Sequence, residues 1–370
     1  ELAKMGEVLT NSQIGGRRNI VINGAMNISQ RATSATGVGA NNGVYPTVDR
    51  IKVVALNTAG RATMSQVADV HDGFANALKL ECTTADTSIA SNEAFLLQTG
   101  FEGQDLQQLK KGTSDAEKVT VSFYVKGNAN ATYGVELEDG DNSRFNSQSF
   151  AVTTNWTRVS KTFIADTTGS LDDDNALSLS LNIWLHGGSD FSGGTFSSNT
   201  WHTTTNQRLV DSQTSFFDST DRTFFITGLQ MEIGSQATPF EHRSFGEELA
   251  LCERYFQKHF GTTDGNHYTV FPVNRWGANT GFTTIQLRQI MRAEPSMSVL
   301  SKDGSAPSDP VGNVAGNGNN DNYNSGNMTL QQAHDGTTTI TIGLDYNPDG
   351  NYAHVGYFGN GERLDFDAEL

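Results

Sequence analysis

The chain has 370 residues, of which 36% are hydrophobic, and a formal net charge of −16 with a pI near 4.8. Its length exceeds the usual size of one domain, so we expect two domains of unequal length. Nucleic acids and anionic membrane surfaces are bound through Lys and Arg, so this acidic chain is expected to have no nucleic-acid partner. The sequence shows no apolar run of about 18 residues, so we expect no membrane insertion. It also shows no signal peptide, so we expect no secretion by the usual route. Neutral sugars or bound cations are more compatible with this net negative charge.

The first segment, ELAKMGEVLTNSQIGG, has a helical pattern. Leu2, Met5 and Leu9 recur at three- and four-residue spacing before a glycine pair ends the stripe. A helix this short is unstable alone in water, so it either packs on its own domain or forms the end of a stem shared by several chains. We assign residues 1–18 to an N-terminal helical stem. Because the chain does not begin with Met, we also expect further residues upstream.

From residue 19 onward the apolar period changes to two. In VTVSFYVKG, for example, Val119, Val121, Phe123 and Val125 share one face. Ten short strands without a long helix between them predict an antiparallel sandwich over 19–243, most simply a jelly roll. The predicted strands are 19–22, 50–56, 63–67, 76–82, 93–98, 118–126, 132–138, 158–164, 176–185 and 223–233.

The last of these strands, within DRTFFITGLQMEIG, is the strongest and is expected to close the sandwich. Strict alternation places two sets of side chains on opposite faces. The set expected in the core is Phe225, Thr227, Leu229, Met231 and Ile233, and the set expected outside is Phe224, Ile226, Gly228, Gln230 and Glu232.

One helix is predicted with a clear start signal. Ser244 and Glu247 form a capping-box pair, and Leu249, Cys252 and Phe256 make an apolar stripe. Lys258 and His259 would then lie at the negative end of the helix dipole. We assign residues 244–260 to a linker helix.

A smaller β domain is expected over residues 261–370. Its segment 301–327 is poor in hydrophobic residues and rich in Asn and Gly, which predicts a long loop. The predicted strands of this domain are 268–273, 282–291, 297–300, 328–332, 337–344 and 353–358.

Cys82 and Cys252 are far apart in the sequence and are expected to be buried free thiols.

The aromatic-rich stretch 181–205 contains the candidate glycan-binding residues Trp184, His186, Trp201 and His202. Sugars bind where aromatic rings stack on the apolar face of a pyranose and fixed polar groups meet its hydroxyls. Alternation also allows Trp184 to be a core residue, and Trp201 equally fits a lid or an intersubunit contact.

Two acidic clusters, EDGDNSR and SLDDDN, are candidates for a calcium site through Asp139, Asp141 and Asp173. Calcium takes about six to eight oxygen ligands, and alternate-residue spacing suits it. However, the bidentate Glu of an EF-hand is missing from its position, and Asp and Asn are also ordinary turn residues. We expect no other cofactor.

We expect no catalytic residues. The chain lacks a Walker A loop, a dinucleotide fingerprint, a His-Glu-x-x-His motif and a nucleophile elbow. His71 with Asp72, or Glu136 with Glu138 on one side of a strand, are formal candidates for acid–base chemistry. Sequence cannot establish the carboxyl separation that a glycosidase requires, and solvated turns explain these residues equally well.

Five groups of segments match the pattern of a known family. They are GEVLTNSQIGGRRNIVINGAMNISQRAT, YPTVDRIKV, VTVSFYVKG with TYGVELED, TNWTRVSKTFIAD and FFITGLQMEIGSQATPFEHRSFGEELALCERYF. These segments resemble distal tail-fibre and receptor-binding proteins of short-tailed bacteriophages of marine bacteria and cyanobacteria. They cover about two thirds of the chain and are structural in character, so no ligand contact is carried over onto Gly228, Gln230, Glu232 or Pro239.

This resemblance implies a virion tail-fibre component, made in the host cytoplasm, with a sandwich like a carbohydrate-binding module. It further implies a homotrimer that contacts other phage tail proteins and attaches to a host-surface glycan such as lipopolysaccharide. Two alternatives stay open: an architectural neck, nozzle or decoration protein without glycan binding, and a polysaccharide-degrading enzyme. Residues 301–327 match no part of the family pattern, so the receptor is not predicted.

Overall fold

The structure is a computed structural model that describes residues 17–260, 269–275, 280–300, 313–316, 322–324, 327–334, 339–345, 354–358 and 363–370. Residues 1–16 of the predicted stem lie outside this part. The chain divides into two compact units, Glu1–Glu248 with Leu370 and Leu249–Glu369. Among the described residues, no helix combines the length and apolarity needed to cross a membrane.

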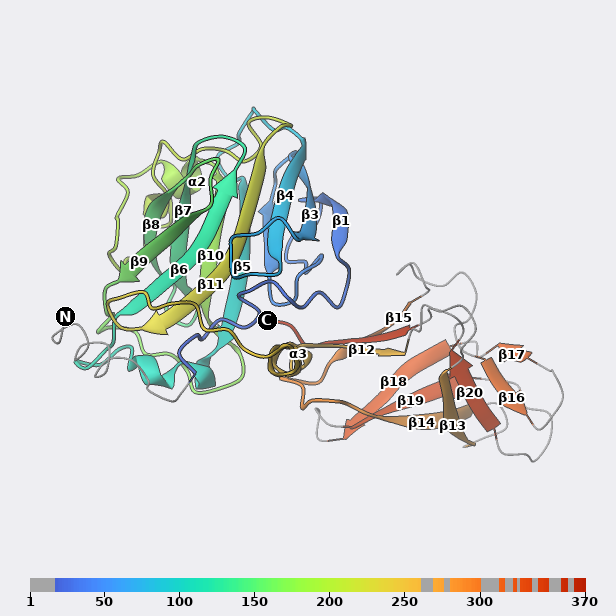
Figure 1. Cartoon of the computed structure of the whole chain (residues 1–370). Coiled ribbons are helices and arrows are strands. Elements are labelled where there is room, and N and C mark those ends of the chain that lie inside the picture. Colours follow the sequence, from blue (N-terminus) through green and yellow to red (C-terminus); the bar gives the residue numbers. More distant parts are fainter. Residues whose placement is uncertain are drawn as a thin grey trace. The chain divides into compact units, whose positions relative to one another are not determined.

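The first unit is a sandwich of two antiparallel sheets (Figure 1). The chain passes repeatedly from one sheet to the other, as in a jelly roll, which confirms the predicted mainly β sandwich. The six-stranded sheet has the order β1 (Ser34–Val38), β3 (Arg61–Val67), β4 (Ala77–Thr84), β11 (Thr223–Ile233), β6 (Val119–Gly127), β9 (Thr157–Phe163). The five-stranded sheet has the order β2 (Lys52–Leu56), β5 (Ala94–Glu102), β10 (Leu177–Gly187), β7 (Ala131–Asp139), β8 (Arg144–Val152).

The core lies between the two sheets because alternate side chains of each strand point inward. In β6 the inward set is the predicted one, Val119, Val121, Phe123 and Val125. Each fully buried side chain of this size contributes about 1.5–3 kcal/mol relative to an exposed one. Two strands, β1 and β8, were not predicted, because their sequences lack a run of apolar residues.

The alternation predicted for β11 is wrong over its first half. Phe224 and Ile226 lie in the core, whereas Thr227 donates its hydroxyl to the carbonyl of Asn76. The pairing with β6 shifts register between Thr227 and Gln230, around Gly228, whose φ is +63°. This β-bulge inserts one residue and reverses the faces, so that Leu229 and Met231 again point inward.

The predicted strand 19–22 is not a strand. The segment forms a turn in which Asn23, at φ 61°, uses its side chain in place of a ladder. Its amide donates to the carbonyls of Ile28 and Asp49, and its carbonyl accepts from the Ile28 backbone N–H. Asn tolerates this left-handed conformation better than other residues with a side chain.

The helix α3 spans Phe245–Glu253, so the predicted helix 244–260 is too long. The capping box is confirmed: Ser244 Oγ donates to Glu247 Oε2 at 3.0 Å, and the Glu247 N–H donates to Ser244 Oγ at 3.3 Å. Residues 256–260 form strand β12 (Phe256–Phe260), which pairs with β21 (Arg363–Asp367) from the far end of the chain. This long-range pairing overrides the local helical pattern.

The second unit contains two antiparallel sheets. The first has the order β12, β21 and β15 (Ser296–Leu300). Strands β16 and β17 fall inside 301–327, so the predicted loop is interrupted there. The second sheet has the order β17 (Asn322–Asn324), β16 (Asn313–Gly316), β20 (His354–Phe358), β13 (Thr269–Arg275), β14 (Thr280–Gln286), β19 (Thr339–Asp345), β18 (Asn327–His334).

Both cysteines are buried free thiols, as predicted. Burial raises the pKa of the Cys82 thiol to about 11, so this group stays protonated at neutral pH.

Candidate functional site

The outer face of the five-stranded sheet is largely covered by its own chain. The segment that follows β10 contains the helix α2 (Ser189–Ser192) and a 3₁₀ turn (Thr205–Gln207), and it packs Phe191 and Leu209 against Trp184. Trp184 is only 2% exposed, and its Nε1 donates to Glu136 Oε1 at 3.0 Å. The structure therefore moves Trp184 from the candidate glycan surface into a second small core.

His186 is also buried, with no exposed surface. Its Nδ1 lies 2.8 Å from Ser215 Oγ and its Nε2 lies 3.1 Å from Glu93 Oε2. Burial lowers the pKa of His186, although the nearby Glu93 acts to raise it. The imidazole is therefore neutral at neutral pH. Although this order matches a Ser–His–Glu triad, Ser215 Oγ also accepts the Phe217 N–H, as in a turn. These hydrogen bonds hold the segment that follows β10, which we call the covering segment, against the five-stranded sheet.

A polar row crosses all five strands of the same sheet in register. Gln98 donates to Asn182 at 3.0 Å, and Asn182 donates onward to Glu136 at 3.0 Å. Such linked side chains fix one another's rotamers. The row consists of Lys52, Gln98, Asn182, Glu136 and Ser147.

Glu136 and Glu138 lie on the same side of β7, as the sequence predicted, and both bind Arg208. Burial acts to raise the pKa of Glu136, but the Arg208 guanidinium and the hydrogen bonds from Asn182 and Trp184 hold it below its ordinary value. Burial and the charge of Glu136 raise the pKa of Glu138 against the opposing effect of Arg208. Glu136 is fully enclosed by these partners, so it is not placed to act on a substrate.

Trp201 and His202 lie at an edge of the sandwich beside β8 and β9. His202 pairs with Phe145 through both backbone groups, at 2.8 and 3.0 Å, and burial lowers the pKa of its imidazole. The Trp201 indole Nε1 donates to the carbonyl of Ile164 at 2.9 Å, and the ring is partly buried against the main core. Of the four predicted glycan contacts, only Trp201 and His202 therefore have exposed surface.

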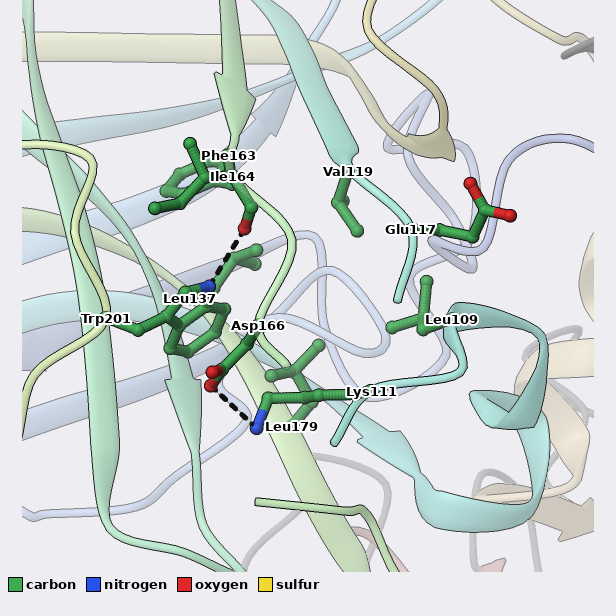
Figure 2. Close-up of a pocket in the computed structure, with 10 residues that line it drawn as sticks. All are labelled: Leu109, Lys111, Glu117, Val119, Leu137, Phe163, Ile164, Asp166, Leu179 and Trp201. Carbon is green, nitrogen blue, oxygen red and sulfur yellow. Dashed lines mark hydrogen bonds and ion pairs between the residues drawn. The ribbon is translucent and has the colours of Figure 1, made fainter. Parts of the chain in front are cut away.

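A small crevice opens beside Trp201 (Figure 2). Its volume of about 20 Å³ suits a single water molecule and is too small for a sugar ring. Figure 2 shows the Lys111 ammonium turned toward Asp166 and the Trp201 indole turned toward the Ile164 backbone. The Lys111 ammonium lies 5.1 Å from the Trp201 ring centroid, within cation–π range.

Asp139, a predicted calcium ligand, lies in an ion pair with Lys111. The Lys111 ammonium forms ion pairs with Asp139 and, at 3.1 Å, with Asp166, and all three side chains are at most 5% exposed. Asp139 further accepts the backbone and side-chain N–H groups of Asn142. A cation at Asp139 would have to displace the ammonium, so the fold uses this predicted ligand as an ion-pair partner.

The other two calcium candidates do not join Asp139 in a cluster. Asp141 accepts the Asp172 N–H at 2.9 Å, a contact between two loops that lie 31 residues apart, and Asp173 is exposed. Over the described ranges, no three His, Cys, Asp or Glu side chains come together in a way that could hold a metal ion.

An open groove lies on the other side of Lys111 and has a volume of about 440 Å³. Leu106 and Leu171 provide its apolar part. This size falls within the range of about 300–1,000 Å³ found for small-molecule sites. The polar lining residues are Gln107, Lys110, Lys111, Thr113, Asp115 and Ser170.

The shape of the groove is set by local backbone features. Lys110 adopts a left-handed conformation at φ 49°, which ends the 3₁₀ turn Gln107–Leu109 and turns the chain toward β6. Gln107 Nε2 donates to the carbonyls of Gly103 and Asp172, both at 3.1 Å, and so ties the two walls together. Lys110 pairs with Glu117 at 3.2 Å in an exposed ion pair, which is weak. Sequence reasoning missed these residues because QQLKKGTSD has the composition of an ordinary turn.

No family model and no curated protein matches the chain. Among solved structures, a family 4 carbohydrate-binding module shares 12% identity, with 57% of this chain and 98% of that chain covered and a TM-score of 0.30. The module TmCBM61, solved with β-1,4-galactotriose, shares 11% identity, with 59% and 100% covered and a TM-score of 0.29. The active domain of tailspike protein 4 of bacteriophage CBA120 shares 10% identity, with 58% and 21% covered and a TM-score of 0.30.

At these TM-scores the likenesses do not indicate a function. What the fold and the groove define is a mainly β protein whose larger unit is an antiparallel sandwich with an open polar groove at one edge.

Proposed function

We propose that the protein is a non-catalytic phage tail-fibre component that attaches the virion to a host-surface glycan such as lipopolysaccharide. The observation that carries the glycan proposal is the open groove of about 440 Å³ beside Lys111. The phage context comes from the sequence resemblance described above.

The lining of the groove suits a saccharide. Lys110 supplies N–H donors, Asp115 supplies carboxylate acceptors, and the Ser170 hydroxyl supplies both functions. The Gln107 N–H groups and the Thr113 hydroxyl donate within the chain and shape the groove. Leu106 and Leu171 belong to the buried core and form the apolar base of the groove. An open groove of this kind gives weak single contacts, and a homotrimer would add them through avidity.

Two features support the non-catalytic part of the proposal. Glu136 is held in ion pairs and hydrogen bonds inside the sheet face, and His186 is sealed beneath the covering segment. A glycosidase requires two carboxyl groups that both reach the sugar. The most acid–base-like groups of the first unit are thus committed to structure.

The proposal is tested by probing an array of purified bacterial lipopolysaccharides and capsular polysaccharides with the full chain, with mass photometry of the same sample. Binding to at least one polysaccharide by a trimer supports a tail fibre. A chain that binds none of them, in any oligomeric state, favours the architectural alternative. Release of reducing ends from a bound polysaccharide would instead identify an enzyme.

A further inference from the structure

A cluster of aromatic rings lies on the outer side of the six-stranded sheet, away from the groove. We call it the aromatic patch and define it as His71, Phe74, Tyr124, Phe240 and His242. His71 stacks on Tyr124 at 4.2 Å, and Phe74 lies 5.5 Å from Tyr124, 5.1 Å from Phe240 and 5.3 Å from His242. Four of the rings are half-buried and His242 is exposed. Aromatic side chains gathered on a surface in this way are typical of binding sites.

The patch is assembled from three separate segments: the loop between β3 and β4, strand β6, and the stretch that precedes α3. The bulge of β11 provides its floor. A Cβ atom on Gly228 would lie 2.7 Å from Phe74 Cζ and 3.0 Å from Tyr124 Cδ2, so the two rings rest directly on this glycine. The β-bulge that reverses the faces of β11 therefore also provides the surface on which the Phe74 and Tyr124 rings pack.

Polar contacts hold the three segments together around the rings. Thr227, next to the bulge, donates to the carbonyl of Asn76 at 2.7 Å and anchors the β3–β4 loop. Arg158 on β9 lies 5.9 Å from the Tyr124 ring centroid and donates to the carbonyl of Thr238, which fixes the stretch before α3. The rings are thus pre-organised, which lowers the entropic cost of binding.

The charges at the border favour a neutral ligand. Lys126 is paired with Asp69 at 2.7 Å, and Arg158 is engaged by Tyr124 and Thr238. A polyanion would compete with Asp69 and would meet a chain of net charge −16. A neutral sugar avoids both costs because it carries no charge. Its C–H face can stack on a ring, and its hydroxyls can reach imidazole and phenol groups.

We propose that the aromatic patch is a second glycan site, specific for neutral oligosaccharides, which shares no lining residue with the groove. It goes beyond the proposed attachment function, because it does not depend on the groove being occupied. Two unlike sites on one unit would let the chain bind a neutral backbone and a substituted part of the same polysaccharide at once.

The test probes an array of cello-, malto-, laminari-, manno- and xylohexaose with the full chain, followed by titration calorimetry with the hexaose that is retained. Phe74→Ala and Phe240→Ala are each expected to lower affinity by about tenfold or more, as for removal of a central aromatic contact. Tyr124→Phe keeps the ring and is expected to keep most of the binding. The matched control is Phe245→Ala, which removes a 64% exposed ring outside the patch and leaves binding unchanged.

Thermal unfolding of each variant separates loss of the site from loss of the fold. If Phe74→Ala is unfolded, Phe240→Ala, at the edge of the patch, decides the result. The proposal is overturned if the wild-type chain retains no hexaose, if both ring variants bind as well as wild type, or if the patch instead drives self-association that Phe240→Ala abolishes. The double variant Lys110→Ala, Asp115→Ala alters only the groove, so it retains hexaose binding if the two sites are distinct. Failure of the groove proposal can therefore be distinguished from failure of the aromatic-patch proposal.

Discussion

The guanidinium of Arg208 forms a bidentate ion pair with the carboxylate of Glu136. Nε donates to Oε2 at 2.8 Å, and Nη2 donates to Oε1 of the same carboxylate. The Glu136 side chain has no exposed surface and that of Arg208 is 8% exposed. The Arg208 guanidinium also lies 3.9 Å from the Phe145 ring centroid. This two-point ion pair fastens the covering segment to the five-stranded sheet.

Removal of Arg208 is expected to destabilise the first unit strongly. Arg208→Met leaves the Glu136 charge buried without its cation, a change that costs about 3–5 kcal/mol in comparable buried pairs. Urea unfolding followed by tryptophan fluorescence measures it, with exposed Lys118→Met as the control. A loss below about 1 kcal/mol would mean that Glu136 does not depend on Arg208.

Stability is expected to fall at acid pH because two buried carboxyl groups have lowered pKa values. Burial acts to raise the pKa of Asp166, but Arg144 and Lys111 hold it below the ordinary value of 3.8, and Glu136 is held below 4.5. Their contribution is present above those ordinary values and is lost as the pH falls through the lower values of the folded state. Urea midpoints between pH 6 and pH 2.5 measure this loss, and Asp166→Asn is expected to flatten the profile. An equally steep profile in the variant would contradict the assignment to Asp166.

The bulge in β11 is expected to require glycine at position 228. Gly228→Ala combines backbone strain at φ +63° with close contacts to Phe74 and Tyr124. Gly37→Ala is the matched control, since its φ of +68° is similar but nothing lies within 4 Å of the added carbon. We expect Gly228→Ala to cost roughly 1–3 kcal/mol more than the control. Equal costs would show that the rings do not rest on the bulge.

In the second unit, His259 is expected to stay neutral well below the usual range of imidazole. Burial and, to a smaller extent, the nearby Arg288 charge lower its pKa to about 4, while its Nε2 lies 3.0 Å from Gln257 Oε1. Because the unfolded chain takes up the proton at about 6.5, this group reduces stability progressively as the pH falls from about 6.5 toward 4. A titration of the imidazole by NMR is expected to show a midpoint near 4, and a midpoint near 6.5 would contradict the buried placement.

The sequence predicted the sandwich well because its strands follow the period-two pattern. Strand β6 was predicted with its core face correct, and the bounds of β11 were predicted to the residue. The faces of the first half of β11 were wrong, because a bulge depends on how Gly228 fits beneath two rings from other segments. Strand β12 was missed because its partner β21 lies about a hundred residues away in the chain.

The candidate site was predicted only in part, since residue type alone does not reveal what covers a side chain. Trp184 and His186 have the chemistry of a sugar site, but the segment after β10 folds back over them. Trp201 retains exposed surface at the edge, and the groove beside Lys111 arises from turns whose composition gives no functional signal. The aromatic patch was equally hidden, because its rings come from three distant segments.

The groove beside Lys111 is the proposed binding site for a host-surface glycan. The most direct measurement is an equilibrium titration of the wild-type chain and of the Lys110→Ala, Asp115→Ala double variant with a polysaccharide retained on the bacterial lipopolysaccharide and capsule array. Both altered side chains line the groove on the surface, so we expect an unchanged unfolding midpoint and an affinity lower by about tenfold or more. Equal affinities for the two proteins would contradict the account.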